Sequence, residues 1–140
     1  MPSTDASRLS TFSTKNHLAV LSLRAIWPYV RYMTTHISGT IAVIFVAQRT
    51  LVDERGYRAA ASAMDRLAAS QPGYVGIDSV RGADGLGITV SYWADDAAAK
   101  AWRDHPEHAA IRDAGRDRWY SAYSLHVAAV ERSYDWAKVT

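Results

Sequence analysis

The chain contains 140 residues, a length that suits one domain with a modest core. Hydrophobic residues make up 49% of it and charged residues 21%, which is the composition of a globular protein and not of a disordered one. The chain contains no cysteine. A disulfide framework, a thiolate zinc site and a cysteine nucleophile are therefore excluded. The composition fits a reducing compartment, so we expect a cytoplasmic protein.

The basic pI of about 9.0 comes from the N-terminal segment. Residues 1–32 carry four basic side chains and one acidic side chain, a net charge of +3. The remaining residues carry 12 basic and 13 acidic side chains, a net charge of −1. Because the globular part has no positive excess, the composition does not predict a nucleic-acid partner.

Residues 1–40 are expected to be an N-terminal extension outside the fold. Their apolar stretch, residues 18–30, spans 13 residues and includes an arginine and a proline. A membrane-spanning helix needs about 20 apolar residues, so we expect no membrane segment. The stretch is a poor secretory signal, whereas an Arg-rich, Ser-rich and acid-poor segment is typical of a transit peptide. The alternative is that Met33 is the biological start.

The first predicted elements are a strand and a helix. Residues 41–49 are apolar and rich in β-branched side chains, which predicts a strand. Asp53 can cap a helix whose apolar side chains recur at spacings of three and four. The sequence Gln71-Pro72-Gly73 ends that helix, because proline cannot continue it and glycine adopts the left-handed turn.

A hairpin, two helical segments and a last strand follow. The hairpin loop carries Gly85, where a positive φ is expected. Asp95 can cap the next helix, the chain is expected to bend at His105, and Pro106 suits the first turn of a further helical segment. The predicted bounds are strands 74–82 and 86–93, helical segments 96–102 and 106–119, and a last strand 121–132.

This order of elements predicts an α+β fold of the ferredoxin-like βαββαβ type, a four-stranded antiparallel sheet with helices on one face. The first strand is apolar on both faces, so the face without helices also needs a cover. Each face spans roughly 500 Å², near the upper limit of what soluble monomers expose. A second copy is the simplest cover. We therefore expect a homodimer through the sheet face, with 41–134 as the domain and 135–140 as a tail.

Gln48 and Arg49 end the first strand, one on each face. An amide in a cavity could hold a substrate carbonyl or oxyanion, and an arginine there could bind substrate. The alternative for both is a strand end that reaches solvent. Trp102 follows alanines on one helix face, so it is either core or the aromatic wall of a pocket. Trp119 is a further substrate-binding candidate, with core or dimer interface as its alternative.

His105 and His108 flank Pro106-Glu107. The sequence HxxH lacks the glutamate of the HExxH metal motif and no cysteine is available, so a metal site is not expected. One of the two histidines could transfer a proton, because the reference pKa of about 6.5 suits that work. The alternative is that both are helix-capping residues at the surface.

Four stretches resemble the antibiotic biosynthesis monooxygenase (ABM) family. They are IAVIFVAQRT (41–50), QPGYVGIDSVRGADGLGITVSYW (71–93), AWRDHPEH (101–108) and RDRWYSAYSLHVAAVER (116–132). The resemblance extends over nearly all of 41–134 and none of 1–32. It implies a dimeric α+β barrel with a ligand cavity between the sheet and its helices. Some members of the family oxygenate polyketide-derived phenols without metal or flavin, others open haem, and others isomerise or degrade small metabolites.

The resemblance also suggests site residues. Oxygenating members have an asparagine near the end of the first strand and a tryptophan on the second long helix, which Gln48 and Trp102 resemble. Haem-degrading members add a histidine about three helical turns after the tryptophan, where this chain has Arg112.

The sequence therefore predicts a cofactor-independent monooxygenase that acts on a small electron-rich aromatic or enol metabolite. One alternative is a non-catalytic dimeric module that binds a small apolar ligand or has a structural role. Another is a haem-degrading monooxygenase. The predicted catalytic residues are Gln48, Trp102, His105 and His108, and the predicted substrate-binding residues are Arg49, Trp102 and Trp119.

Overall fold

The chain divides into two units, residues 1–32 and 33–140, and the fold is that of the second unit. The structure, a computed structural model, describes residues 37–139. The expected N-terminal extension and the alternative start at Met33 therefore lie outside the described residues, apart from the last four residues of that extension. None of the helices within 37–139 is long and apolar enough to cross a membrane.

The described elements follow the predicted order. They are β1 (Ile41–Arg49), α2 (Glu54–Ala69), β2 (Tyr74–Arg81), β3 (Leu86–Trp93), α3 (Asp96–Asp104), α4 (Pro106–Ala114), a π-helical turn (Gly115–Trp119) and β4 (Tyr120–Ala129). The last strand was predicted to reach residue 132, which is wrong, because its pairing with β1 ends where Ala129 meets Ile41 at the start of that strand.

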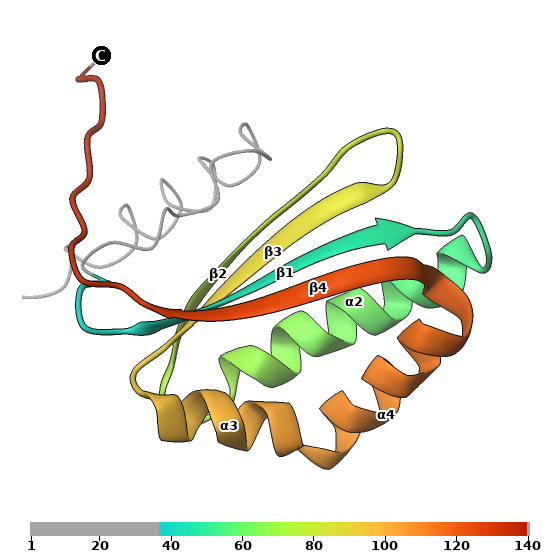
Figure 1. The fold of residues 1–140 in the computed structure, drawn as a ribbon, viewed down its shortest axis with the longest axis horizontal. Coiled ribbons are helices and arrows are strands. Elements are labelled where there is room, and N and C mark those ends of the chain that lie inside the picture. The colour runs from blue at the N-terminus through green and yellow to red at the C-terminus, as the bar shows by residue number, and fades with distance from the viewer. Residues whose placement is uncertain (1–36, 140) are drawn as a thin grey trace, which may run out of the picture. The chain divides into compact units, whose positions relative to one another are not determined.

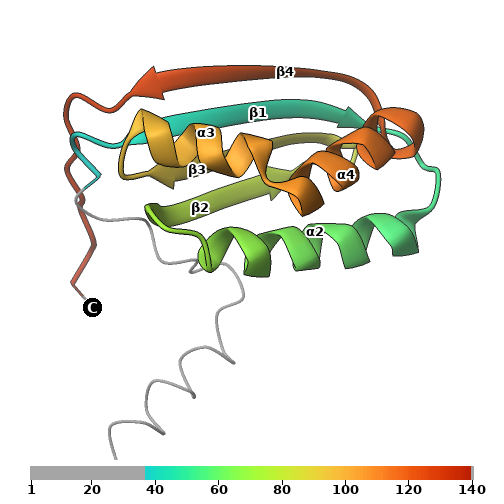
Figure 2. The ribbon, with the colours of Figure 1, turned by 90° about the horizontal axis from the view of Figure 1, so that it is seen from below.

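The four strands form one antiparallel sheet in the order β2-β3-β1-β4. The helices α2, α3 and α4 all lie on the same side of it (Figures 1 and 2). This arrangement confirms the predicted α+β, ferredoxin-like fold.

Helix α2 begins and ends as its sequence signals predict. Asp53 adopts a left-handed conformation (φ 51°), and its Oδ1 accepts a hydrogen bond from the backbone N–H of Gly56 at 3.0 Å. Beyond the helix, Gly73 has φ +79°, and a Cβ there would lie 2.5 Å from the Cβ of Ala98 on α3. Glycine therefore lets the turn between α2 and β2 pack directly onto α3.

The buried core lies between the sheet and the helices, near the start of β1. Trp93, Ala68 and Ala99 form its centre. The partly buried side chains packed against them are Ile41, Val43, Tyr74, Ala98 and Trp102. The odd-numbered side chains of β1 thus point toward the helices, and the even-numbered ones point to the open face of the sheet.

The helices cover the edge strand β4 less than its alternating apolar side chains predict. Leu125 and Val127 pair with Phe45 and Val43, so they point to the helix side, yet they are 52% and 55% exposed. β4 is the edge of the sheet farthest from α2 (Figure 2), so the helices do not cover it.

The open face of the sheet carries an apolar patch on β2 and β3. Val80 is 68% exposed, Leu86 46% and Ile88 41%. The register places Ile88 opposite Val46, which confirms that these side chains share the face without helices. This is the face that the sequence predicts to be covered by a second copy.

Candidate functional site

Trp102 stacks on two other rings where α3 meets α4. The Trp93 ring centroid lies 5.7 Å away with an interplanar angle of 24°, and the His108 centroid lies 4.3 Å away with an angle of 7°. Trp93 is fully buried, whereas Trp102 and His108 are partly exposed. The stack forms because His105 is extended (ψ 128°) and Pro106 starts a new helix, which turns His108 back over the tryptophan.

The hydrogen bond of His108 fixes which ring nitrogen carries the proton. Its Nδ1 lies 2.9 Å from the carbonyl oxygen of Trp102. Because a carbonyl can only accept, Nδ1 is the donor, and in the neutral ring Nε2 holds the free lone pair. Burial lowers the pKa of His108, the bond to the carbonyl partly opposes this, and the charges of Arg112 and His105 lower it further. His108 is therefore a neutral base at neutral pH.

His105, the other predicted proton carrier, has a structural task. Its Nδ1 accepts a hydrogen bond from the backbone N–H of Glu107 at 3.3 Å, so His105 is the N-cap of α4. Its ring lies 6.1 Å from that of Trp102. The structure thus brings Trp102, His105 and His108 together. Of the two histidines, the half-buried His108 is the one whose basic nitrogen, Nε2, accepts no hydrogen bond from the described residues.

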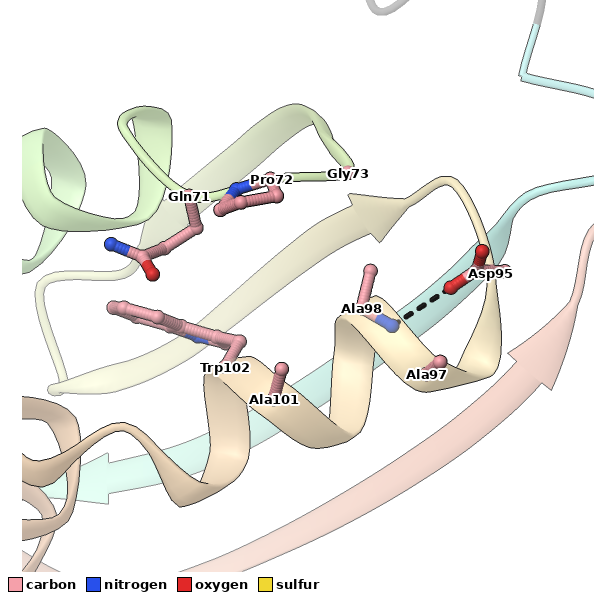
Figure 3. A pocket seen from close by; sticks show the side chains of 8 residues that line it. All are labelled: Gln71, Pro72, Gly73, Asp95, Ala97, Ala98, Ala101 and Trp102. Carbon is pink, nitrogen blue, oxygen red and sulfur yellow. Dashed lines mark hydrogen bonds between the residues drawn. The ribbon is translucent and has the colours of Figure 1, made fainter.

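A groove of about 360 Å³ runs beside Trp102, between α3 and the turn that follows α2 (Figure 3). This volume is at the low end of small-molecule sites, about 300–1,000 Å³. Alanines of α3 make an apolar floor, and the Gln71 amide and the Trp102 ring face each other across the groove (Figure 3). The lining residues are Gln71, Pro72, Gly73, Asp95, Ala97, Ala98, Ala101 and Trp102.

Gln71 is a polar group of the groove that the sequence did not single out. Its Nε2 donates to the carbonyl oxygen of Leu67 at 3.1 Å and contacts Ser70 Oγ at 3.2 Å. These bonds orient the amide so that Oε1 has no donor among the described residues and can accept from a ligand hydroxyl. In the sequence Gln71 only marks the end of a helix, and the packing of the turn on α3 is visible only in the fold.

Arg49 and Trp119 lie together at the other end of the sheet. The guanidinium carbon of Arg49 is 3.4 Å from the ring centroid of Tyr57, and the Trp119 ring is 6.0 Å from the same ring. Trp119 Nε1 donates to Asp53 Oδ2 at 3.3 Å. Because Arg49 ends β1 whereas Ile41 pairs with Trp93 beside Trp102, the two clusters lie about 26 Å apart along the strand.

The structure does not bring Gln48 to Trp102 within one chain. Arg49 packs on α2, so its neighbour Gln48 points to the open face of the sheet. There its Nε2 donates to the carbonyl oxygen of Asp84 at 2.7 Å and braces the loop between β2 and β3. A role for Gln48 beside Trp102 thus stays a prediction that would need a contribution from a second copy.

Arg112 stands at the position that resembles the histidine of haem-degrading members. Its Nη1 donates to the carbonyl oxygen of Arg103 at 3.0 Å, and its Nε is buried without a partner among the residues that the structure describes. An arginine keeps its protons and has no lone pair for iron. Within 37–139 no group of three or more His, Cys, Asp or Glu side chains could hold a metal ion.

The fold and the groove define a small α+β domain with an apolar groove beside the Trp102 ring. The family model described as "Antibiotic biosynthesis monooxygenase" matches residues 53–114. The uncharacterized protein YqjZ of Bacillus subtilis (strain 168) is 48% identical over 91 residues, which cover 65% of this chain and 79% of YqjZ. The chain belongs to the antibiotic biosynthesis monooxygenase family.

Solved structures share the fold at low sequence identity. SnoaB, a cofactor-independent oxygenase from Streptomyces nogalater, superimposes with a TM-score of 0.59 at 13% identity, over 69% of this chain and 97% of SnoaB. Rv0793 from Mycobacterium tuberculosis gives a TM-score of 0.58 at 19% identity, over 71% of this chain and 99% of Rv0793. At these identities the likeness concerns the fold alone.

Acidification is expected to destabilise the fold through His108. The folded state holds the pKa of His108 below the value of about 6.5 in the unfolded chain, so the unfolded state binds the proton first. The free energy of unfolding should therefore fall as the pH drops from about 6.5 through the lower pKa of the folded state. His108→Gln should remove this part of the slope, as measured by urea denaturation between about pH 5 and 8.

The matched control is His105→Asn, which removes an imidazole, can keep the N-cap of α4 and leaves His108 in place, so the acid slope that His108 causes should remain. A slope that is unchanged in His108→Gln would assign the acid sensitivity to other groups.

Proposed function

We propose that the protein is a cofactor-independent monooxygenase of the ABM type, with a small electron-rich aromatic or enol as substrate. The observation that carries this proposal is that Trp102, which lines the groove, stacks on His108, whose Nε2 is unprotonated; His108 itself lies behind Trp102 and is not a lining residue of the groove. Membership of the family and the fold shared with an oxygenase support it.

In the proposed reaction the substrate supplies the electrons. His108 Nε2 takes a proton from an activated C–H or O–H of the substrate, and the resulting carbanion reduces dioxygen. One oxygen atom stays on the carbon as a carbonyl and the other leaves as water with the two hydrogens of that carbon (CH2 + O2 → C=O + H2O), so the substrate supplies all four electrons that reduce dioxygen. The protein has to orient the substrate, carry the proton and stabilise the anion that forms.

The side chains around the groove suggest how these tasks are divided. Trp102 forms the wall against which a flat substrate would lie, with the alanines of α3 as an apolar floor. Gln71 Oε1 would accept a hydrogen bond from a substrate hydroxyl. Arg112, one helical turn after His108, has a buried Nε without a partner among residues 37–139, and its positive charge would favour an enolate or phenolate near His108.

The competing function is a non-catalytic module that binds a small ligand. The specific observation in its favour is that His108 stacks on Trp102 at 4.3 Å, a ring contact that a substrate lying against Trp102 would have to share or displace. In that case the groove would bind aromatic molecules without turning them over.

Oxygen uptake by the metal-stripped protein distinguishes these functions. It is measured with a panel of anthrones, hydroquinones and catechols as substrates. A monooxygenase consumes oxygen with at least one of them, and Trp102→Phe reduces that rate in a protein that remains folded. Binding without oxygen uptake for every panel member would favour the ligand-binding module. A haem titration belongs to the same experiment, since a tight haem spectrum would favour the haem-degrading alternative despite Arg112.

We also propose that the protein is a homodimer through the open face of its sheet. Val80, Leu86 and Ile88 form an exposed apolar patch there, of the kind that marks an interaction surface. Light scattering is expected to give twice the chain mass of 15.4 kDa at micromolar concentration. Ile88→Glu should shift the protein toward the monomer, because a charge would be buried in the interface.

Leu125→Glu is the matched control, since Leu125 is similarly exposed but points to the helix side of the sheet. A dimer that dissociates in Leu125→Glu and persists in Ile88→Glu would place the interface on the helix side of β4.

A further inference from the structure

Arg49 is a buried cation whose Nε–H has no hydrogen-bond acceptor among residues 37–139. Its side chain is only 4% exposed, and its guanidinium lies flat against the Tyr57 ring, 3.4 Å from the centroid. Nη2 pairs with Glu54 Oε2 at 3.0 Å, but Nε is buried with no partner in the described part of the chain. A buried donor that stays unpaired costs free energy, so an acceptor at this position would stabilise the protein.

Arg81 brings a second guanidinium to the same ring. Its guanidinium carbon is 5.2 Å from the Tyr57 centroid, and its Nη2 donates to the Tyr57 hydroxyl at 2.7 Å. The side chain crosses the sheet over Gly87, where an added Cβ would lie 2.8 Å from the guanidinium carbon. Nη1 donates to the carbonyl oxygen of Gly85 at 2.6 Å. The strand thus leaves room for this arginine and holds it at Tyr57.

The local charges do not balance. Among residues 37–139 no carboxylate lies within ion-pair distance of Arg81, and Glu54 is shared by Arg49 and by Arg58 at 3.8 Å. The nearby Asp53 is engaged by Arg118 at 3.9 Å and by the indole N–H of Trp119. Two guanidinium groups that converge on one ring repel each other, and an anion between them would relieve this repulsion.

Two phenols border the converging arginines. The Tyr120 ring centroid lies 6.2 Å from that of Tyr57, and burial raises the pKa of Tyr120, so Tyr120 keeps its proton. The Tyr57 hydroxyl oxygen accepts the hydrogen bond from Arg81 Nη2. Tyr120 therefore adds no negative charge that would offset the two arginines.

We propose that Arg49 and Arg81, which converge on the Tyr57 ring, form a binding site for a small oxyanion, the carboxylate or phosphate group of a ligand. Arg81 is exposed and receives the anion from solvent, whereas Arg49 Nε donates from the buried side. This site is separate from the groove at Trp102, about 26 Å away along β1, and does not depend on the proposed oxygenation.

The experiment follows the indole N–H resonance of Trp119 in the full chain, because this ring lies 6.0 Å from Tyr57. The probes are benzoate and inorganic phosphate at constant ionic strength, with benzamide as the uncharged match of benzoate. Titration with at least one anion should shift the resonance saturably, and benzamide should not. The indole resonance of Trp102 reports any binding at the groove separately.

Arg81→Gln tests the contact without touching the core, because Arg81 is exposed. It should weaken anion binding by about tenfold or more, the effect of losing a charge-assisted hydrogen bond. Arg58→Gln is the control, since Arg58 shares Glu54 but is not placed at Tyr57, and it should bind like the original chain. The proposal is overturned if neither anion shifts Trp119, or if Arg81→Gln and Arg58→Gln bind equally.

Discussion

Trp93→Ala is expected to lower the free energy of unfolding by about 3–5 kcal/mol, the usual cost of emptying a buried aromatic site. Trp93 is fully buried, packs with Ala68 and Ala99, and stacks on Trp102. Its Nε1 donates to Ser91 Oγ at 3.0 Å, so the truncation also leaves a buried hydroxyl without its donor. Since the total free energy of unfolding of a small domain is only about 5–15 kcal/mol, Trp93→Ala should remove much of the stability.

Urea denaturation followed by circular dichroism measures this loss, at one protein concentration because a dimer's stability depends on concentration. Trp136→Ala is the control, since Trp136 is 77% exposed and should change stability by no more than about 0.5 kcal/mol. Equal effects of the two variants would mean that the layer between sheet and helices is not the main source of stability.

The fold was predictable because its signals are local. The cap at Asp53, the glycine at 85 and the proline at 106 each act within a few residues, and all three occur where the sequence predicts them. The end of β4 was not predictable in this way. No proline or glycine ends the strand at Ala129, but pairing with β1 stops there, and that limit is set by the neighbouring strand.

The candidate site was predictable only in part, because it depends on contacts between distant segments. The sequence names Trp102, His105 and His108, but only the bend at Pro106 shows that His108 stacks on the tryptophan while His105 caps a helix. Gln71 is more than 20 residues from the helix it faces, so no spacing reveals it. The converging arginines at Tyr57 are likewise brought together only by the sheet and α2.

His108→Gln is expected to lower kcat/KM of any oxygenation by about 10²–10⁴-fold, the usual contribution of a general base. The reason is that Nδ1 is bound to the Trp102 carbonyl and only Nε2 can take the substrate proton. Glutamine retains a polar side chain of similar length but cannot accept a proton at neutral pH. The variant should therefore still bind ligand at the groove while turnover is lost.

His105→Asn is the matched control for this variant. Asparagine is a good N-cap and can keep the hydrogen bond to the backbone N–H of Glu107, so α4 should be retained while an imidazole is removed. Its turnover should stay within a few-fold of the original chain.

The pH profile distinguishes a proton-accepting His108 from one that only supports Trp102. Because burial lowers the pKa of His108, the base form persists below pH 6.5, and kcat/KM should fall to half only at a lower pH. That acid limb should disappear from the residual activity of His108→Gln and persist in His105→Asn. An acid limb that survives in His108→Gln would make His108 a packing residue and leave the base to be found elsewhere.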